Sequence, residues 1–361
     1  MRLIGINSEG FRNLVPASLC FRSKRVFFLG PNGQGKTNLL EAIGMSSNLR
    51  SFRKSGLDGL VREGQKEARL FFRFIDSLDN EHEVLLGFKE RGQKELELNG
   101  EKITKLGDYL GLFPSVTLSS RDFRLIREGP ADRRKWMDML LSSASNEYLD
   151  CLQSFHRSLR ERNALLKRGG KDSEFAAFEQ MLAHSAISLQ RLRVQAFPSL
   201  CEQLSRAYHS LSDGEEEAGL SYLPNLPHLS AKELFSRYRS DRDRDQILGS
   251  TRSGPHKDDF KFLLNKKDAR TFASEGQQRG LVLSLRLAEF SYLHKILQRI
   301  PLLLADDVLG ELDNQRKSNF KKLLPDEAQV FATGTTLPSQ KDKEFWETFR
   351  VSAGTFTKDI L

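Results

Sequence analysis

The stretch VFFLGPNGQGKTNLLEAI, residues 26–43, joins an apolar run, a glycine-rich turn and the start of a helix. It matches G-x-x-x-x-G-K-[ST] at every fixed position, and a strand before and a helix after are the context which that pattern requires. Glycines let successive backbone N–H groups turn towards one anion at the positive end of a helix. The stretch therefore predicts a loop that binds the phosphates of a nucleoside triphosphate, formed by Gly30, Pro31, Asn32, Gly33, Gln34, Gly35, Lys36 and Thr37.

A second stretch supplies the acids that such a loop needs. The run PLLLA at 301–305 predicts a buried parallel strand, and Asp306 and Asp307 follow it directly. We expect Lys36 to contact the β and γ phosphates and Thr37 to bind Mg²⁺. Asp306 would hold the metal through water, and Asp307 would polarise the attacking water. The alternative is a core strand with acids at its exposed end.

A third stretch predicts another anion-binding helix end. In ASEGQQR, residues 273–279, Ser274 and Gln277 have the spacing of a capping box, and Gly276 keeps the approach to the helix open. Capped helices are common, but in a chain with a phosphate-binding loop the expected ligand is the γ-phosphate held by another protomer. The sequence GELD at 310–313 stands where a dimer-contact loop is expected, which favours the catalytic interpretation of the two acids.

Size and composition permit two domains and a polyanionic partner. The chain has 361 residues and a formal net charge of +8. That charge suits a nucleic acid, although ordinary solubility charge explains it equally well.

The cysteines are far apart and lack metal-ligand spacing, and His256 has no second ligand, so we assign no metal to either. Without a signal peptide or membrane span, a cytoplasmic location is expected.

The first part of the chain predicts a sheet. Short strands are expected at 2–7, 17–22 and 26–29, followed by a pair at 70–76 and 82–90. Asn99-Gly100 between two short polar-apolar runs predicts a hairpin with a type I′ turn. An antiparallel meander after the phosphate-binding loop argues against simple P-loop kinases.

Helices are expected to dominate from about residue 122 to 208, so we divide the chain into an ATPase lobe at 1–125, a helical insertion at 126–246 and a second ATPase part at 247–361. The charged segment 236–246 is expected to be a surface helix or linker. Arginines of the insertion would line a DNA track or form an ordinary solvated face, and the second interpretation is favoured. They are Arg157, Arg160, Arg162, Arg191 and Arg193.

The order of these stretches resembles that of the ABC-type ATPases of the SMC and Rad50 class. Within that class the sequence is similar to the RecF family of bacterial recombination mediators. The matching stretches sample nearly the whole chain, and their joint order is specific although several are weak alone. They are FRN (11–13), GPNGQGKTNLLEAI (30–43), RSFR (50–53), GPADRR (129–134), GPHKDD (254–259), SEGQQR (274–279) and DDVLGELD (306–313).

The resemblance implies an α/β fold, namely a P-loop ABC-type (Rad50-like) ATPase head with an antiparallel β meander and an inserted helical lobe. It implies ATP and Mg²⁺ as cofactors, with Arg12 and Asn13 as further nucleotide contacts. It also implies an ATP-dependent homodimer, in which each Ser274 loop closes on the partner's nucleotide, and binding of DNA at single-stranded gaps and junctions with duplex. The family acts with RecR and RecO to place the RecA recombinase on such gaps during DNA repair and replication.

The sequence departs from the ABC pattern at three places. Serines at 119 and 120 and Asp122 stand where a magnesium-sensing glutamine is usual, and Thr333-Gly334-Thr335 occupies the region of the switch histidine. Gly310 replaces a serine of the family's E-L-D loop. Since Asp307 is also shorter than the glutamate of transporter ATPases, we expect slow hydrolysis that acts as a timer.

Two other functions share some of these motifs. The ATPase subunit of a membrane transporter has all the nucleotide motifs, but the early hairpins, the arginine-rich insertion and the basic charge argue against it. A P-loop kinase would phosphorylate a small molecule, and it has no use for the S-x-G-Q and E-L-D pair. The leading hypothesis is an ATP-gated DNA clamp.

Overall fold

The computed structural model describes residues 1–53, 59–89, 93–212, 214, 216–226, 230–308, 314–337 and 346–359. The chain forms two compact units, one made of Met1–Asp122 with Glu289–Leu361 and the other of Phe123–Ala288. The loop expected at 310–313 lies outside the described residues. Within the described ranges, none of the helices combines the length and the apolarity that crossing a bilayer demands.

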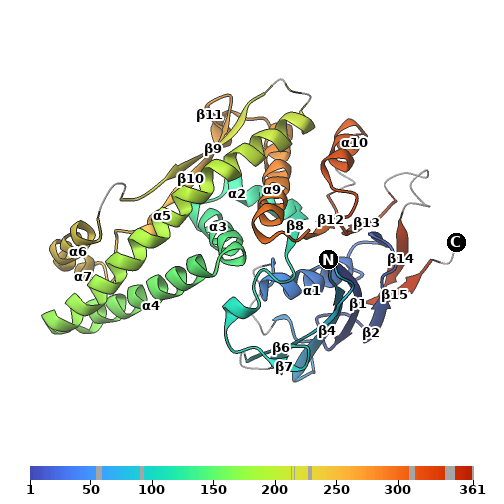
Figure 1. Cartoon of the computed structure of the whole chain (residues 1–361), viewed down its shortest axis with the longest axis horizontal. Helices are drawn as coiled ribbons and strands as arrows, with labels where there is room; N and C mark the ends of the chain where they lie inside the picture. The colour runs from blue at the N-terminus through green and yellow to red at the C-terminus, as the bar shows by residue number, and fades with distance from the viewer. Residues whose placement is uncertain are drawn as a thin grey trace. The chain divides into compact units, whose positions relative to one another are not determined.

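The first unit contains an antiparallel sheet in the order β2-β1-β4-β5-β6-β7 (Figure 1). Its strands are β1 (Arg2–Glu9), β2 (Ala17–Cys20), β4 (Glu67–Ile75), β5 (Glu81–Lys89), β6 (Lys94–Leu98) and β7 (Glu101–Lys102). Asn99 and Gly100 join β6 to β7 with φ angles of 52° and 80°, which is the left-handed geometry of a type I′ turn. The predicted meander and its hairpin are thus confirmed.

A second sheet of the same unit carries the phosphate-binding loop, in the order β15-β14-β3-β13-β12-β8. Its strands are β3 (Arg25–Leu29), β8 (Ser115–Ser119), β12 (Leu302–Asp306), β13 (Val330–Gly334), β14 (Glu347–Ser352) and β15 (Thr355–Lys358), and the helices of the unit are α1 (Lys36–Asn48) and α10 (Asn314–Leu323). All neighbouring strands pair in parallel except β14 and β15.

The parallel register explains how distant segments form one site. Leu29 at the end of β3 pairs with Gly334 of β13, and Ala332 of β13 pairs with Ala305 of β12. Carboxyl ends of parallel strands share one edge of a sheet, where ligands of open α/β sheets bind. The loop after β3, the acids after β12 and Thr333 are therefore neighbours.

A phenylalanine-rich core joins the two sheets and α1. Phe28 of β3 stacks on Phe331 of β13 with ring centroids 6.4 Å apart, and Phe21 lies edge-on to Phe331 at 5.0 Å. These rings are at most 4% exposed. Burial of each contributes about 1.5–3 kcal/mol, so the core fixes the strand that leads into the loop.

The second unit is mainly helical, with a small antiparallel sheet in the order β11-β10-β9. Its elements are α2 (Arg124–Arg127), α3 (Pro130–Ala144), α4 (Asn146–Arg168), α5 (Asp172–Leu211), β9 (Ala218–Leu223), α6 (Ala231–Ser240), α7 (Arg242–Ile247), β10 (Asp259–Leu264), β11 (Lys267–Asp268), α8 (Ala269–Phe272) and α9 (Glu275–Leu297), whose last turns belong to the first unit. The long helices α4 and α5 pack side by side (Figure 1).

The limits of the units differ from the domain division expected from the sequence. The first unit ends at Asp122, close to the expected limit at 125, but residues 247–288 fold with the helical unit. The reason is strand pairing, because β10 pairs along its whole length with β9, and Asp259 lies opposite Leu223.

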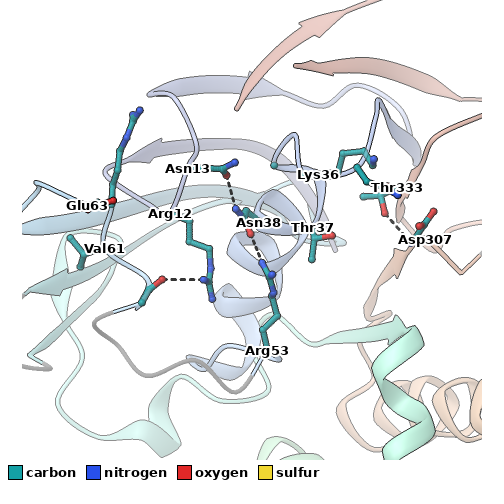
Figure 2. Close-up of a pocket in the computed structure, with 15 residues that line it drawn as sticks. Arg12, Asn13, Lys36, Thr37, Asn38, Arg53, Val61, Glu63, Asp307 and Thr333 are labelled. Carbon is teal, nitrogen blue, oxygen red and sulfur yellow. Dashed lines mark hydrogen bonds between the residues drawn. The ribbon is translucent and has the colours of Figure 1, made fainter. Parts of the chain in front are cut away.

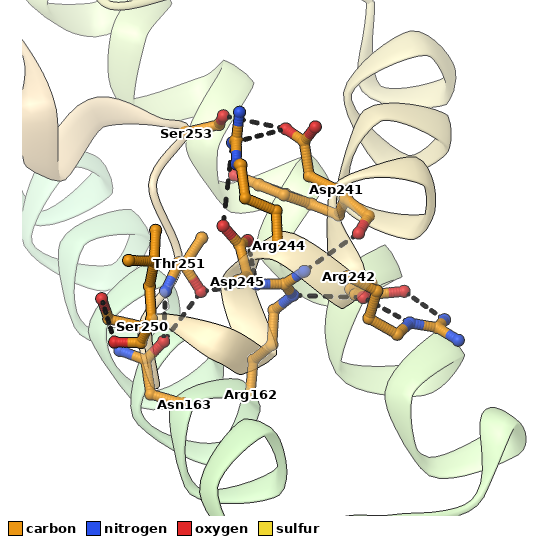
Figure 3. Close-up of polar contacts among 12 residues, drawn as sticks. Arg162, Asn163, Asp241, Arg242, Arg244, Asp245, Ser250, Thr251 and Ser253 are labelled. Carbon is orange, nitrogen blue, oxygen red and sulfur yellow. Dashed lines mark hydrogen bonds and ion pairs between the residues drawn. The ribbon is translucent and has the colours of Figure 1, made fainter.

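Two of the arginines considered for a DNA track are core residues, so both sequence interpretations were wrong for them. Arg162 of α4 is fully buried and donates to Asp245 at 2.8 Å and to Thr251 at 2.7 Å (Figure 3). Arg193 of α5 is 2% exposed and donates to Asp258 at 2.9 Å. Buried charges need such partners, and their inward direction was not apparent from sequence spacing.

Candidate nucleotide-binding site

The phosphate-binding loop is a backbone structure at the start of α1. Gly35 is the N-cap with φ of 109°, and no side chain caps this helix end in the part of the chain that the structure describes. A Cβ at Gly35 would also lie 3.2 Å from Asn13 Oδ1. Left-handed geometry and close approach both require glycine here, and they leave the N–H groups of the first turn available to an anion.

Lys36 lies inside this loop rather than in solvent. It is 6% exposed, and its ammonium group donates to the carbonyl oxygens of Gly30 and, at 2.8 Å, of Pro31. Burial lowers the pKa of Lys36, while the nearby carboxylates of Asp307 and Asp306 oppose that shift. A phosphate that reaches the loop would therefore meet an ammonium group already directed into it.

A group of oxygen atoms lies between the helix start and the ends of β12 and β13. Thr37 Oγ1 donates to Asp306 Oδ1 at 2.8 Å, and Thr333 Oγ1 donates to the same oxygen at 3.0 Å. Thr333 Oγ1 in turn accepts the backbone N–H of Asp307 at 2.9 Å. The sequence prediction that Thr37 and Asp306 act together is consistent with this geometry, although 269 residues separate them.

These oxygens fit a hard divalent cation. Hydroxyl, carboxylate and phosphate oxygens are the usual ligands of Mg²⁺, which needs few protein groups when a nucleotide supplies the rest. Burial raises the pKa of Asp306, and the hydroxyl groups of Thr37 and Thr333 oppose this. A bound cation would relieve the cost of keeping that carboxylate ionised. Among the described residues, no group of three or more histidine, cysteine, aspartate or glutamate side chains could hold a metal ion.

Two arginines and two asparagines line the pocket on the side away from Asp307 (Figure 2). Asn38 donates to Asn13 Oδ1 at 2.5 Å and accepts from the guanidinium of Arg53. Arg12 donates to Glu41 Oε1 at 2.6 Å and to the carbonyl of Gly59 at 3.0 Å. The resemblance-based prediction of Arg12 and Asn13 is thus consistent with their position.

The pocket enclosed by these groups has a volume of about 830 Å³, enough for a mononucleotide. Of the predicted nucleotide contacts, the residues that line it are Arg12, Asn13, Asn32, Gly33, Gly35, Lys36, Thr37 and Asp307. The other lining residues are Asn38, Arg53, Gly59, Val61, Arg62, Glu63 and Thr333. All of them belong to the first unit.

Sequence reasoning missed the role of several lining residues. Arg53 was quoted in the RSFR stretch without a function, and Asn38 and the segment 59–63 received no comment. The segment reaches the pocket because its backbone pairs with that of Arg12, whose N–H donates to Leu60 O at 2.8 Å. Arg53 could have been found from its place in a matching stretch, but nothing local marks segment 59–63.

Gln34 was predicted as a nucleotide contact but has a different set of partners. Its side-chain Oε1 accepts the N–H of Ala353 at 2.7 Å, and its carbonyl accepts that of Gly354 at 2.9 Å. Gly354 has φ of 78°, and a Cβ there would lie 2.2 Å from Asn13 O. The turn between β14 and β15 therefore supports the loop from outside. Gly30, Pro31, Gln34 and Asp306 are not among the described lining residues.

The predicted capping box at the start of α9 is confirmed. Gln277 N–H donates to Ser274 Oγ at 3.3 Å, and Ser274 N–H donates to Gln277 Oε1 at 2.6 Å. Ser274 is exposed, Gly276 lies in the first turn, and the Gln277 amide donates to Glu216. This helix end is in the second unit and is no part of the pocket described above, so its ligand stays a prediction.

The sequence departures have clear structural counterparts. At the end of β8, Ser119 N–H donates to the buried carboxylate of Asp122 at 2.8 Å, so this segment is closed by an internal contact. Thr333, in the region of the switch histidine, lines the pocket. Its hydroxyl group donates to Asp306 and accepts the backbone N–H of Asp307.

Comparisons with known proteins identify the family of this chain. Residues 2–353 match the family described as RecF/RecN/SMC N terminal domain. Proteins named DNA replication and repair protein RecF are similar over nearly their whole length. The protein of Microcystis aeruginosa is 35% identical over 94% of each chain, and that of Leptospira interrogans serovar Lai is 36% identical over 95% of this chain and 94% of its own.

Solved structures of RecF proteins are also similar to this chain. A recombination mediator protein RecF described with ATP superimposes with a TM-score of 0.90 and 32% identity, covering 99% of this chain and 97% of the other. A second RecF structure gives 0.89 and 31%, covering 99% and 98%. An Smc head bound to the C-winged helix domain of ScpA, at a TM-score of 0.54 and 16% identity, shares the fold alone.

Proposed function

This chain belongs to the RecF family of DNA replication and repair proteins, within the wider RecF/RecN/SMC group, and on that premise we propose that it is an ATP-gated, DNA-binding recombination mediator. Its action requires ATP, Mg²⁺ and a second copy of the chain. Membership of this family favours a mediator over the ATPase subunit of a transporter.

The observation that carries the proposal is that Asp306, from a segment far away in sequence, accepts a hydrogen bond from Thr37, which lines the pocket together with Lys36. In the proposed complex the loop N–H groups and Lys36 hold the β and γ phosphates. Thr37 and Asp306 hold Mg²⁺, which neutralises phosphate charge. Asp307 polarises the attacking water from its place on the pocket wall.

We further propose that the ATP-bound form is a homodimer. The capped N-terminus of α9 is exposed at Ser274, and helix N-termini attract phosphate oxygens. In the dimer, Ser274, Gly276 and Gln277 of one copy contact the γ-phosphate bound to the other. ADP lacks that phosphate, so hydrolysis removes the contact and opens the dimer. Because an aspartate and Thr333 replace the glutamate and histidine of faster ATPases, hydrolysis is slow and limits how long the dimer persists.

Membership of the family supports the partners that we propose for this chain. The two solved relatives are described as recombination mediators in the RecFOR pathway. We propose that the closed dimer binds gapped DNA or the junction of single and double strands in the cytoplasm. There it acts with RecO and RecR to promote loading of RecA.

The test is the molecular mass of the protein in solution with ATP, with ADP and without nucleotide, each with and without gapped DNA. Dimers that form with MgATP and dissociate with ADP support the proposal. Lys36→Ala should abolish nucleotide binding, dimerisation and ATP-dependent DNA retention together.

Ser274→Arg separates the two sites. It should leave ATP binding by the monomer intact and abolish the dimer, whereas Ser236→Arg, at an exposed site on α6, is the matched control. Dimers of the Ser274 variant would contradict the contact in trans. A wild-type protein that stays monomeric with MgATP and gapped DNA would overturn the proposed function.

A further inference from the structure

The exposed face of α4 and the loop that follows α7 carry six exposed cations that form no ion pair with the described residues, although Glu161 also lies on α4. We propose that this surface, defined by Arg157, Arg160, Lys167, Arg168, Arg252 and Lys257, binds the phosphate backbone of the duplex part of the DNA substrate. The inference rests on the proposed function, in which these residues of the second unit would contact the DNA.

Most other arginines of the second unit already have acidic partners. Arg191 lies 2.7 Å from Glu147, Arg206 lies 2.6 Å from Glu202, and Arg237 lies 2.8 Å from Asp241. Arg162 and Arg193 are buried among carboxylates. Charge that is neutralised within the protein adds little to the attraction of a polyanion.

The cations of α4 differ from these. Arg157, Arg160, Lys167 and Arg168 are exposed, and none forms an ion pair with another residue in the described part of the chain. Their spacing of three, seven and one residues places them on the outer side of the helix, away from its buried stripe at Phe155, Ser158, Arg162, Leu165 and Leu166. They span about 16 Å along the helix axis.

The loop 249–257 extends this surface, because it runs antiparallel along the same flank of α4. Gly249 lies beside the Lys167 side chain, Thr251 N–H donates to Asn163 Oδ1 at 2.8 Å, and the His256 ring packs 5.8 Å from that of Phe155. Arg252 and Lys257 are exposed on this loop and form no ion pair with described residues. The loop therefore meets the cations of α4 at Lys167 and adds two more exposed cations along the same helix.

The GPHKDD stretch, which the nucleotide site does not use, holds this loop in place. Pro255 O accepts from Arg193 at 2.9 Å, and Asp258 binds Arg193 and the N–H of Asn225 at 2.7 Å. Asp259 forms a two-bond ion pair with Arg133, at 2.7 and 2.9 Å. The backbone of Lys257 is fixed from both sides, which lowers the entropy lost when its side chain binds a ligand.

Electrostatics around His256 agree with a local excess of positive charge. The pKa of His256 is lowered to about 4, mainly by burial; Lys257, Arg134 and His156 also lower it, while the hydrogen bond with Thr251 O opposes the shift. Adjacent cations without partners repel one another, and a polyanion relieves that repulsion while it releases its own counter-ions.

Duplex backbone fits this surface better than single strands do. Proteins that bind single strands combine basic grooves with exposed aromatic rings for base stacking. The two large aromatic rings of α4, Tyr148 and Phe155, are both 1% exposed, so neither offers such a platform. A span of about 16 Å matches about five phosphates of one strand of a duplex. The surface therefore has the chemistry for sequence-independent phosphate contact.

The experiment compares two triple variants with equal change in net charge. Arg157→Gln, Arg160→Gln and Lys257→Gln together remove unpaired cations, whereas Arg191→Gln, Arg206→Gln and Arg237→Gln remove exposed but paired ones. The anisotropy of fluorescein-labelled gapped duplex is measured with MgATP over a series of NaCl concentrations. ATP binding and ATP-dependent dimerisation are measured in parallel, and both should be unchanged in the two variants.

The first variant should bind DNA more weakly and lower the slope of log K against log[salt] by about 0.9 per lost contact, up to about 3. The control should change the slope far less. Equal slopes in the two variants would overturn the inference, and so would unchanged DNA affinity in the first variant. If the wild-type protein binds no DNA with ATP, the proposed function fails first, and the inference fails with it.

Discussion

The substitution Glu41→Gln tests how the arginine wall of the nucleotide pocket is held. Glu41 is fully buried on α1 and accepts from Arg12 at 2.6 Å and from Ser51, while a guanidinium nitrogen of Arg53 lies 3.8 Å away. Glutamine has the same size but no charge, so both arginines would lose their buried counter-ion. We predict lower stability and weaker nucleotide binding.

The magnitude follows from the burial of the partners. Breaking a fully buried ion pair costs about 3–5 kcal/mol. The side chains of Arg12 and Arg53 are still 15% and 27% exposed, and glutamine retains one acceptor, so we expect about 2–3 kcal/mol. In a unit of this size that lowers Tm by about 4–12 °C.

Nucleotide affinity provides the second measurement. Arg12 and Arg53 both line the pocket, and a hydrogen bond to a charged group contributes about 1.5–3 kcal/mol. A displaced arginine should therefore weaken MgATP binding by about 10-fold to 100-fold, measured by calorimetry well below Tm. Ser51→Ala is the control, because it removes one hydrogen bond to Glu41 but keeps the charge. Wild-type Tm and affinity in Glu41→Gln would refute the reasoning.

Two further predictions concern titratable groups. The pKa of His256 is about 4, against 6.5 for an unburied histidine, so on acidification the unfolded chain takes up the proton first. Stability of the second unit should fall from about pH 6.5 to pH 4, by up to about 3 kcal/mol, and pH-dependent melting of His256→Gln should lack this component. Because burial raises the pKa of Asp306, keeping its carboxylate ionised without a metal costs stability. Asp306→Asn should raise Tm in EDTA while weakening MgATP binding at least about tenfold, and a lower Tm in EDTA would contradict this account.

The sequence was sufficient for features encoded within a few residues. The phosphate-binding loop, the buried strand before Asp306, the Asn99-Gly100 hairpin and the Ser274 capping box each depend on a local pattern with a known backbone geometry. The meeting of Thr37 with Asp306 was also expected, because carboxyl ends of parallel strands share an edge.

Contacts between distant segments could not be predicted in the same way. Gln34 lies in a phosphate-binding motif, yet its partners are 319 residues later in the chain, in the turn after β14. The support that Glu41 gives to Arg12 is equally hidden, because a helix interior glutamate is normally solvated. Local spacing cannot show which side chains face a second sheet or a terminal hairpin.

The second unit shows why conspicuous charge need not mark a chemical site. Arg133 and Arg134 belong to GPADRR, and Asp258 and Asp259 belong to GPHKDD. Arg133 pairs with Asp259 and Arg134 donates to Asp258 O at 2.8 Å, so these two family-like stretches contact each other. Burying Arg193 requires neutralising carboxylates, which Asp258 supplies. The acids of GPHKDD are thus structural, and Lys257 is its exposed cation.

Thr333 gives a physical reason to expect the slow hydrolysis that we propose. A hydroxyl has one proton to donate, and Thr333 donates it to Asp306 at 3.0 Å while accepting the N–H of Asp307 at 2.9 Å. Asp307 has φ of 58°, so this bond holds a residue in left-handed geometry at the pocket wall. Thr333 can thus orient both acids but cannot serve as a general base, because a hydroxyl does not take up a proton near neutral pH. In the proposed reaction, activation of water would depend on Asp307, and a short carboxylate in this role would favour persistence of the ATP-bound state over rapid turnover.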